Sequence, residues 1–460
     1  MTALGRACEC LAPDFWRVIL PARATESEKS LYMRVLFLSA DFVVPDDRGL
    51  RVRTLSQLRL LAAMEEVERI TFLSLSESEV SSDRLRALEK AVPKVRAEPS
   101  VVRPAHWRKD AKSLVRFLAL RFLCREPYLV AEVNSREMRG LIRRHLSTES
   151  YDIVYLGNIG MTTYLREVRR ITPCAGVVLE EHNVEWRIFD RLAESLRPPK
   201  RQAAHLEARA LRRFERKALR DVDSVIAISK ADAEGLRELS RIDSVVVPPF
   251  VEVGPPRVES TQAPALGYIG HLGWQPNTYG LDWFCSEVWP LVRERVPNAT
   301  LTIAGPGLRT GPDGSLTVPT KWSQPGIKTV GFVNDLEDVY RATLALVAPV
   351  LGGSGVRMKL LEAMRAGMPT VTTTDGAAGL DVADGREMLV ADSPAAFAVN
   401  VARVLSDRSL RERLRAGGYA YLDAHHSQMV VRKSLERAVA QAGSRARGSV
   451  AASPREGKRP

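Results

Sequence analysis

The glycine-rich stretch APVLGGSGVRMKLLEAMRAGMPTVTTT, residues 348–374, has the residue types of an anion-binding site. An apolar strand leads into it, the glycines allow a tight turn, and we expect a helix over 355–366. Backbone N–H groups at a helix start attract phosphate, and the helix dipole adds to this. Arg357 and Lys359 would supply two cations, and Glu362 a carboxylate for sugar hydroxyls. A glycine-rich turn with surface charges on the helix accounts for these residues equally well.

Two more loops follow apolar strands. The segment LEEHNVEWRIF, 179–189, puts His182 and Asn183 at the carboxyl end of its strand. A histidine there can bond to a substrate hydroxyl or titrate near neutrality, although a satisfied structural histidine is commoner. The glutamates of this segment could equally be solvated surface charges without a role in a site. In ADFVVPDDRGLRVR, 40–53, Gly49 precedes a helix and would let a phosphate or acceptor approach the backbone; a turn with surface arginines is the alternative.

Strand-like and helical patterns alternate along most of the chain, which predicts an α/β protein with parallel sheets covered on both faces. A proline-rich break separates two such runs. We therefore expect two doubly wound Rossmann-like domains at 33–247 and 265–425, joined by a linker at 248–264. Ligands bind beyond the carboxyl ends of strands in such sheets, so the three loops would face one cleft. The expected strands are 33–40, 69–75, 152–157, 175–180, 223–228, 244–247, 265–270, 299–304, 327–331, 344–348, 369–373 and 387–391.

The two ends of the chain show other patterns. Residues 1–32 have no clear periodicity and read as a poorly ordered extension, with Met33 as an alternative start. A long helical pattern covers 408–440, and its last part, 426–441, is a helix that could cross back onto the first domain. The remaining 442–460 reads as a disordered basic tail.

Composition excludes several classes of protein. The 460 residues are 45% apolar and 27% charged, values that allow large cores and exclude wholesale disorder. Five scattered cysteines give neither a disulfide framework nor zinc-site spacing, so we expect a cytoplasmic protein without a metal site. The uncharged run 342–356 is too short, and too broken by proline and glycine, to span a bilayer.

The net charge of +12 lies on the first half of the chain and on the tail, where residues 441–460 hold 5 Lys and Arg against 1 Glu. Residues 33–245 hold 39 Lys and Arg against 31 Asp and Glu, giving +8, whereas 246–440 are balanced at 19 and 19. One source is the basic amphipathic stretch 106–125, HWRKDAKSLVRFLALRFLCR. It suits the anionic inner face of the cytoplasmic membrane, and a helix packing its apolar side on the domain is the alternative. No aromatic ladder or motif indicates nucleic-acid binding.

Taken together, these segments resemble the retaining family-4 glycosyltransferases of GT-B fold, the glycosyl transferases group 1 type. The resemblance covers 33–425. Its most specific part is GGSGVRMKLLEAMRAGMPTVTTTDGAAGL followed by DGREMLVADSPAAFA, supported by DSVIAISKAD, GYIGHLGWQPNTYGLDWF and LTIAGPG. It implies a GT-B architecture with a central cleft, and transfer of a sugar from a nucleotide-diphosphate sugar with retention of configuration. It also implies that no cofactor or metal ion takes part.

The resemblance assigns donor-site roles, with two departures. Glu362 matches the second glutamate of the family's Glu-x7-Glu pattern and would hold the donor ribose, but the first glutamate falls at Ser354. The family's phosphate-binding arginine falls at His271, and its lysine around Asn277. Arg357 and Lys359 are the natural substitutes, as catalytic cations that stabilise the leaving diphosphate.

The remaining roles concern the sugar and the acceptor. His182, with Asn183 beside it, matches the family's histidine near the donor sugar and is the third expected catalytic residue. Gly49 matches the acceptor loop. The backbone at Gly270, Gly353 and Gly355 would complete the donor site.

The acceptor stays open between a saccharide, a lipid-linked saccharide and a small molecule. We expect a role in polysaccharide, lipid-linked saccharide or other glycoconjugate biosynthesis, or else the glycosylation of a soluble natural-product aglycone. Because Ser354 and His271 depart from the family pattern, a nucleotide-sugar-binding protein and an epimerase of the same architecture are the rival functions.

Overall fold

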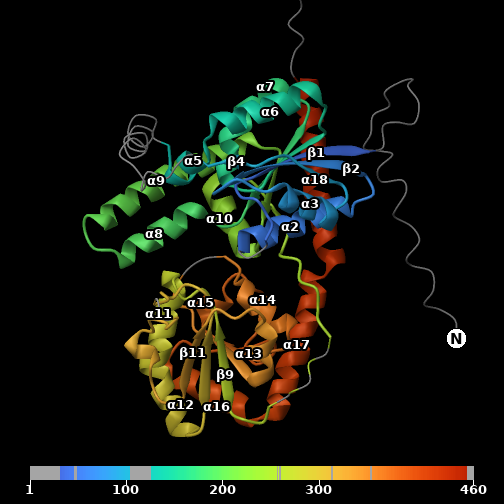
Figure 1. The fold of residues 1–460 in the computed structure, drawn as a ribbon. Helices are drawn as coiled ribbons and strands as arrows, with labels where there is room; N and C mark the ends of the chain where they lie inside the picture. Colours follow the sequence, from blue (N-terminus) through green and yellow to red (C-terminus); the bar gives the residue numbers. More distant parts are fainter. Residues whose placement is uncertain are drawn as a thin grey trace, which may run out of the picture.

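The computed structural model describes residues 32–45, 49–103, 126–255, 257, 259, 261–311, 314–352 and 355–452. Each half of the chain forms a parallel sheet covered by helices, one above the other in Figure 1. The strand order is β3-β2-β1-β5-β6-β7-β8 in the first sheet, with β4 paired to β2, and β11-β10-β9-β12-β13-β14 in the second. Two parallel-sheet α/β domains were expected, and the structure confirms them.

The first sheet is built around β1, whose residues alternate between two cores. Leu36 and Leu38 pack on one face of the sheet, and Val35 and Phe37 on the other, as the two-residue period of a strand requires. The short strands β3 and β4 were not expected, because two or three residues carry no periodicity. The strands are β1 (Met33–Ser39), β2 (Val67–Ser76), β3 (Val95–Ala97), β4 (Val101–Val102), β5 (Ile153–Leu156), β6 (Gly176–Glu181), β7 (Ser224–Ala227) and β8 (Val245–Val246).

Helices cover both faces of this sheet, and two of them, α8 and α9, project from it as a hairpin (Figure 1). Several begin with a serine whose side chain accepts a backbone N–H, as at Ser135 and Ser229. The helices are α2 (Gly49–Ala62), α3 (Ser82–Ala91), α5 (Tyr128–Val133), α6 (Arg136–Thr148), a 3-10 turn (Ile159–Tyr164), α7 (Leu165–Ile171), α8 (Glu185–Ser195), α9 (Lys200–Asp221) and α10 (Lys230–Ser240).

The second domain repeats the plan. The helical segment from Gln275 to Arg295 is divided by a π-helical turn before Pro290, which lacks the N–H that a regular helix needs. Its strands are β9 (Ala265–Ile269), β10 (Thr300–Ala304), β11 (Ile327–Gly331), β12 (Ala345–Ala348), β13 (Thr370–Thr372) and β14 (Leu389–Val390). Its helices are α11 (Gln275–Trp283), the π turn (Phe284–Val288), α12 (Trp289–Arg295), a 3-10 turn (Thr320–Trp322), α13 (Leu336–Ala342), α14 (Met358–Arg365), α15 (Thr374–Ala377), α16 (Pro394–Ser406) and α17 (Arg408–His426).

The last helix, α18 (Gln428–Ala452), returns to the first domain. Val431, Leu435 and Ala438 are fully buried in the core that also contains Phe37. The backbone of α18 approaches β6 so closely that a Cβ on Gly176 would lie 2.7 Å from a backbone carbon. The expected disordered tail at 442–460 is wrong as far as Ala452, because these residues continue α18. Residues 453–460 lie outside the described part of the chain.

None of the helices in the described ranges is long and apolar enough to cross a membrane. The expected extension at 1–32 lies outside the described residues except for Tyr32, and so does the basic stretch 106–125. Their predicted roles stay predictions.

Candidate functional site

The two domains meet at the carboxyl ends of their strands, across β6 and β12. Asn183 follows β6 and Gly355 follows β12. A Cβ on Gly355 would lie 2.5 Å from Oδ1 of Asn183, and the glycine has a φ of +81°. At the rim of the cleft, Nζ of Lys230 lies 2.8 Å from Oδ2 of Asp381. Only glycine satisfies both the backbone conformation at 355 and the close approach to Asn183.

Two half-buried cations stand at the start of α14. The helix begins at Met358, later than expected, so Arg357 caps it and Lys359 lies in its first turn. Burial lowers the pKa of Lys359 to about 8, and the nearby Arg357 contributes. The pKa of Arg357 is lowered as well, mainly by burial, although one of its nitrogens donates to the Gly352 carbonyl at 3.2 Å. Two like charges that are short of solvation create a place that an anion would stabilise.

Lys359 is directed toward the position at which the resemblance places a lysine. Its Nζ donates to Oδ1 of Asn277 at 3.2 Å and lies 5.2 Å from the centroid of the Tyr268 ring. Asn277 in turn donates to the carbonyl of His271 at 3.2 Å. Gly270 packs here too, since a Cβ would lie 3.3 Å from Nδ2 of Asn277. The loop after β9 and the start of α14 therefore form one polar wall, which the sequence did not show.

His182 lies at the end of β6, over a buried ion pair. Its side chain is 13% exposed, and its Nε2 has no hydrogen-bond partner among the described residues. Burial lowers the pKa of His182, while Glu180, at 3.8 Å, partly opposes this. Arg53 binds Glu180 at 2.6 Å, and Tyr155 donates to it at 2.7 Å. The lowered pKa favours the neutral imidazole, and Nε2 is itself buried, facing the carboxylate of Glu180.

Arg53 also ties this network to the interdomain linker. Its two terminal nitrogens donate to the carbonyls of Val247 and Pro248, both at 2.7 Å. An arginine in an amphipathic helix gives no sequence signal of such a role. From the sequence, Glu180 could equally have been a solvated surface charge. It is buried instead, and the ion pair with Arg53 compensates for its burial.

A second group of buried acids lies on the other face of β6. Both oxygens of Glu181 lack a hydrogen-bond partner in the described part of the protein. Burial, and then the neighbouring Glu215, raise the pKa of Glu181 well above its ordinary value. Glu215 caps α8 by accepting from the N–H groups of Glu185 and Trp186, at 2.8 and 3.1 Å. Burial raises the pKa of Glu185 to about 7. Among the described residues, no group of acids, histidines and cysteines is arranged to hold a metal ion.

The structure shows fewer contacts for the other expected site residues. Glu362 lies one turn into α14, where its Oε2 accepts from Nε of Arg365 at 2.7 Å. Gly49 is the first residue of α2, and a Cβ there would meet nothing within 4 Å. His271 is exposed after β9. Gly353 and Ser354 lie outside the described residues.

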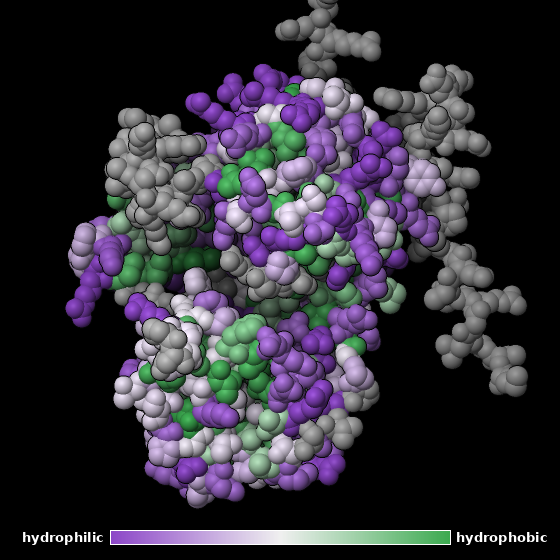
Figure 2. Space-filling view, viewed as in Figure 1, coloured by the Kyte–Doolittle hydropathy of each residue, from purple (hydrophilic) through white to green (hydrophobic). Residues whose placement is uncertain are grey.

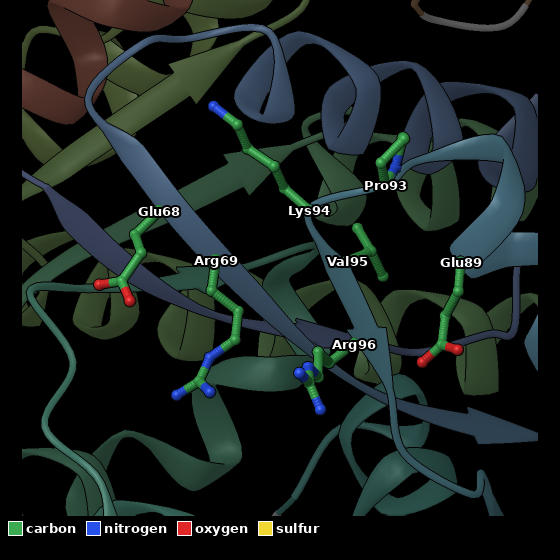
Figure 3. A pocket seen from close by; sticks show the side chains of 7 residues that line it. All are labelled: Glu68, Arg69, Glu89, Pro93, Lys94, Val95 and Arg96. Carbon is green, nitrogen blue, oxygen red and sulfur yellow. The ribbon is translucent and has the colours of Figure 1, made fainter.

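A shallow pocket on the first domain lies apart from this cleft. Figure 3 shows its lining side chains, which come from the amino-terminal ends of β2 and β3 and from the adjoining α3. The loops discussed above follow the opposite ends of their strands. The lining residues are Glu68, Arg69, Glu89, Pro93, Lys94, Val95 and Arg96.

Comparison with solved structures identifies the architecture. Anabaena HepE, crystallised with UDP and glucose, is 13% identical and aligns with a TM-score of 0.57 over 88% of this chain and 99% of its own. Sucrose-phosphate synthase from Thermosynechococcus elongatus is 14% identical, with a TM-score of 0.60 over 92% and 100% of the two chains. The chain has the GT-B fold. S. aureus TarM, in a structure that contains UDP, aligns at 0.62 with 9% identity, over 88% of this chain and 99% of its own.

Sequence comparison concerns mainly the second GT-B domain. Residues 263–407 match the family model described as Glycosyl transferases group 1. A curated Klebsiella pneumoniae relative, an uncharacterized 44.6 kDa protein in a cps region, is 24% identical over 170 residues. That match covers 36% of this chain and 44% of the relative, so the chain aligns with less than half of the relative's length.

Proposed function

We propose that the protein is a retaining glycosyltransferase that moves a sugar from a nucleotide-diphosphate sugar to an acceptor bound on the first domain. The observation that carries the proposal is the pair of half-buried cations, Arg357 and Lys359, at the start of α14. A diphosphate bound beside them would oppose the desolvation that lowers the pKa of both side chains. The group 1 match over 263–407 and the GT-B fold support the same assignment.

Each side chain has a definite task in this proposal. Arg357, Lys359 and the N–H groups at the start of α14 stabilise the negative charge that grows on the diphosphate as its bond to the sugar breaks. His182, at the end of β6 with a side chain that is 13% exposed, lies beside the donor sugar. Glu362 leaves Arg365 to bind the ribose. The departing diphosphate takes the proton of the acceptor hydroxyl on the same face, which gives retention without a resident metal ion.

The acceptor proposal is broader. We propose a saccharide or lipid-linked saccharide, built at the inner face of the cytoplasmic membrane during polysaccharide or glycoconjugate biosynthesis. The basic stretch 106–125 would contact that membrane, and Gly49 would admit the acceptor. A soluble aglycone is the alternative, and it predicts turnover that does not depend on lipid.

Calorimetric titration with UDP, ADP and GDP tests the donor site. We expect one of them to bind the wild type, and Arg357→Ala and Lys359→Met each to weaken binding about tenfold to a hundredfold, the value of a charge-assisted hydrogen bond. Lys328→Met is the matched control, because Lys328 is an exposed lysine on β11 of the same domain.

The outcomes separate the candidate functions. Unchanged affinity in both cation variants would refute the diphosphate site. Binding of the nucleotide sugar without transfer or hydrolysis would favour a binding protein, and release of an altered nucleotide sugar would favour an epimerase. Product analysis by NMR with a saccharide acceptor decides retention, since an inverted anomeric centre contradicts the proposed mechanism.

A further inference from the structure

The projecting helix α9 exposes a row of cations and buries both of its glutamates, and its one exposed acid is the last residue, Asp221. Its glutamates Glu207 and Glu215 face inward and are 8% and 0% exposed. Every lysine and arginine between residues 209 and 220 is exposed. At 100° per residue these side chains fall within an arc of about 140° of the helix. We call this surface the basic face of α9; it consists of Arg209, Arg212, Arg213, Arg216, Lys217 and Arg220.

The basic face has little internal compensation. Arg216 donates to the Leu239 carbonyl at 3.2 Å, and Arg212 lies 5.0 Å from the centroid of the Trp186 ring. Within the described residues, no ion pair joins any of the six to a carboxylate; the nearby pairs are made by Arg187 and His205. Six like charges within twelve residues raise the local potential and attract a surface of opposite sign. The partner of this face is therefore anionic.

Exposed leucines beside the cations favour a lipid partner. Leu206, 53% exposed, falls within the same arc one turn before Arg209, and Leu192 on α8 is 37% exposed. In Figure 2 hydrophobic residues cover part of the α8–α9 hairpin, next to hydrophilic ones at its outer end. Cations that flank apolar side chains suit the headgroup region of a bilayer. A nucleic-acid surface would instead present aromatic rings for stacking, and the basic face has none.

We propose that the basic face of α9, together with Leu206, docks the protein on an anionic phospholipid bilayer. The hairpin begins at Glu185, three residues after His182, so docking would hold the bilayer beside the cleft. The inference concerns a segment separate from 106–125 and does not rest on the proposed transferase activity. It would, however, give a lipid-linked acceptor a short route to the donor.

Vesicle co-sedimentation tests the proposal with the full chain. The wild type is mixed with phosphatidylcholine vesicles that contain or lack phosphatidylglycerol, at low and at high salt. The test variant is Arg209→Gln/Arg213→Gln/Arg220→Gln, since these three side chains have no bond within the described structure whose loss would disturb the fold. The control removes the same charge from other exposed sites of the first domain, Lys90→Gln/Arg136→Gln/Arg144→Gln. Melting curves and UDP titrations accompany each variant.

We expect binding that requires phosphatidylglycerol and is reversed by salt. Each neutralised arginine should weaken it about fivefold, so the test variant loses about a hundredfold and the control only a few-fold. Leu206→Gln should weaken binding to vesicles but not to heparin, a polyanion without an apolar phase. Unaltered folding and UDP affinity in all variants would keep this result separate from the donor site.

Three results would overturn the proposal. If the wild type does not bind the anionic vesicles, or the test variant binds them as well as the control does, α9 is not the docking surface. Binding that survives in the test variant would move that role to another segment, such as 106–125. Equal loss with vesicles and heparin together with no effect of Leu206→Gln would show a general polyanion site.

Discussion

Replacing Gly355 by alanine tests whether the two loops must meet as closely as the structure shows. Two costs arise. A φ of +81° costs an alanine about 1–2 kcal/mol relative to glycine. The new Cβ would also lie 2.5 Å from Oδ1 of Asn183, well inside ordinary contact. Because that oxygen ends a flexible side chain, Asn183 can turn away at about 0.5–1.5 kcal/mol, which breaks its 3.5 Å contact with Glu185.

Gly352→Ala is a matched control, because Gly352 has a φ of +79° and a Cβ there meets nothing within 4 Å. In urea unfolding we expect Gly352→Ala to lose about 1–2 kcal/mol of stability, and Gly355→Ala about 0.5–1.5 kcal/mol more because Asn183 must turn away. Only Gly355→Ala should lose a further factor of about three to ten in affinity for the bound nucleoside diphosphate sugar, measured by calorimetry.

A double-mutant cycle isolates the contact. Combining Gly355→Ala with Asn183→Ala removes the clashing oxygen, so we expect a favourable coupling of about 1 kcal/mol in donor affinity. The reasoning is refuted if Gly352→Ala and Gly355→Ala reduce affinity equally, or if the coupling is zero. Either result would mean that the loops are farther apart when the donor is bound.

Three further predictions concern charges. The affinity for UDP, or for whichever diphosphate binds, should fall as the pH rises through the pKa of Lys359, about 8, whereas Lys359→Arg should remove the decline; a flat wild-type profile in calorimetry would contradict the site. Arg53→Met should cost about 3–5 kcal/mol of stability at pH 7, because Glu180 is left unpaired. Because the pKa of Glu180 is lowered in the folded protein, its ionised form stabilises the wild type at a pH above the pKa of the unfolded state. This stabilisation is lost as the pH falls, so the stability difference between wild type and Arg53→Met should shrink in acid unfolding curves. Glu181→Gln should stabilise the protein at pH 8 but not at pH 4, because the raised pKa of Glu181 costs stability as the pH rises; equal melting temperatures at pH 8 would contradict this.

The sequence predicted the positions of most strands, because short apolar runs bounded by turn residues mark buried strands. It also predicted that Arg357 and Lys359 could serve an anion. It could not show that Lys359 reaches Asn277, since that contact joins residues 82 positions apart. Nor could it show that Glu180 and Glu181 are buried with different pKa directions. Their fates depend on which face of β6 each side chain occupies, and on what three other elements place there.

The return of α18 to the first domain has a consequence for biosynthesis. The core that contains β1 also requires Val431, Leu435 and Ala438, which are synthesised after the whole of the second domain. The first half of the chain must therefore wait, with part of its apolar surface uncovered, until the second half has been made. The second domain does not depend on α18 in this way, since none of its described core residues lies on that helix. A released chain truncated before residue 428 should hold a folded second domain joined to a first domain that still binds chaperones.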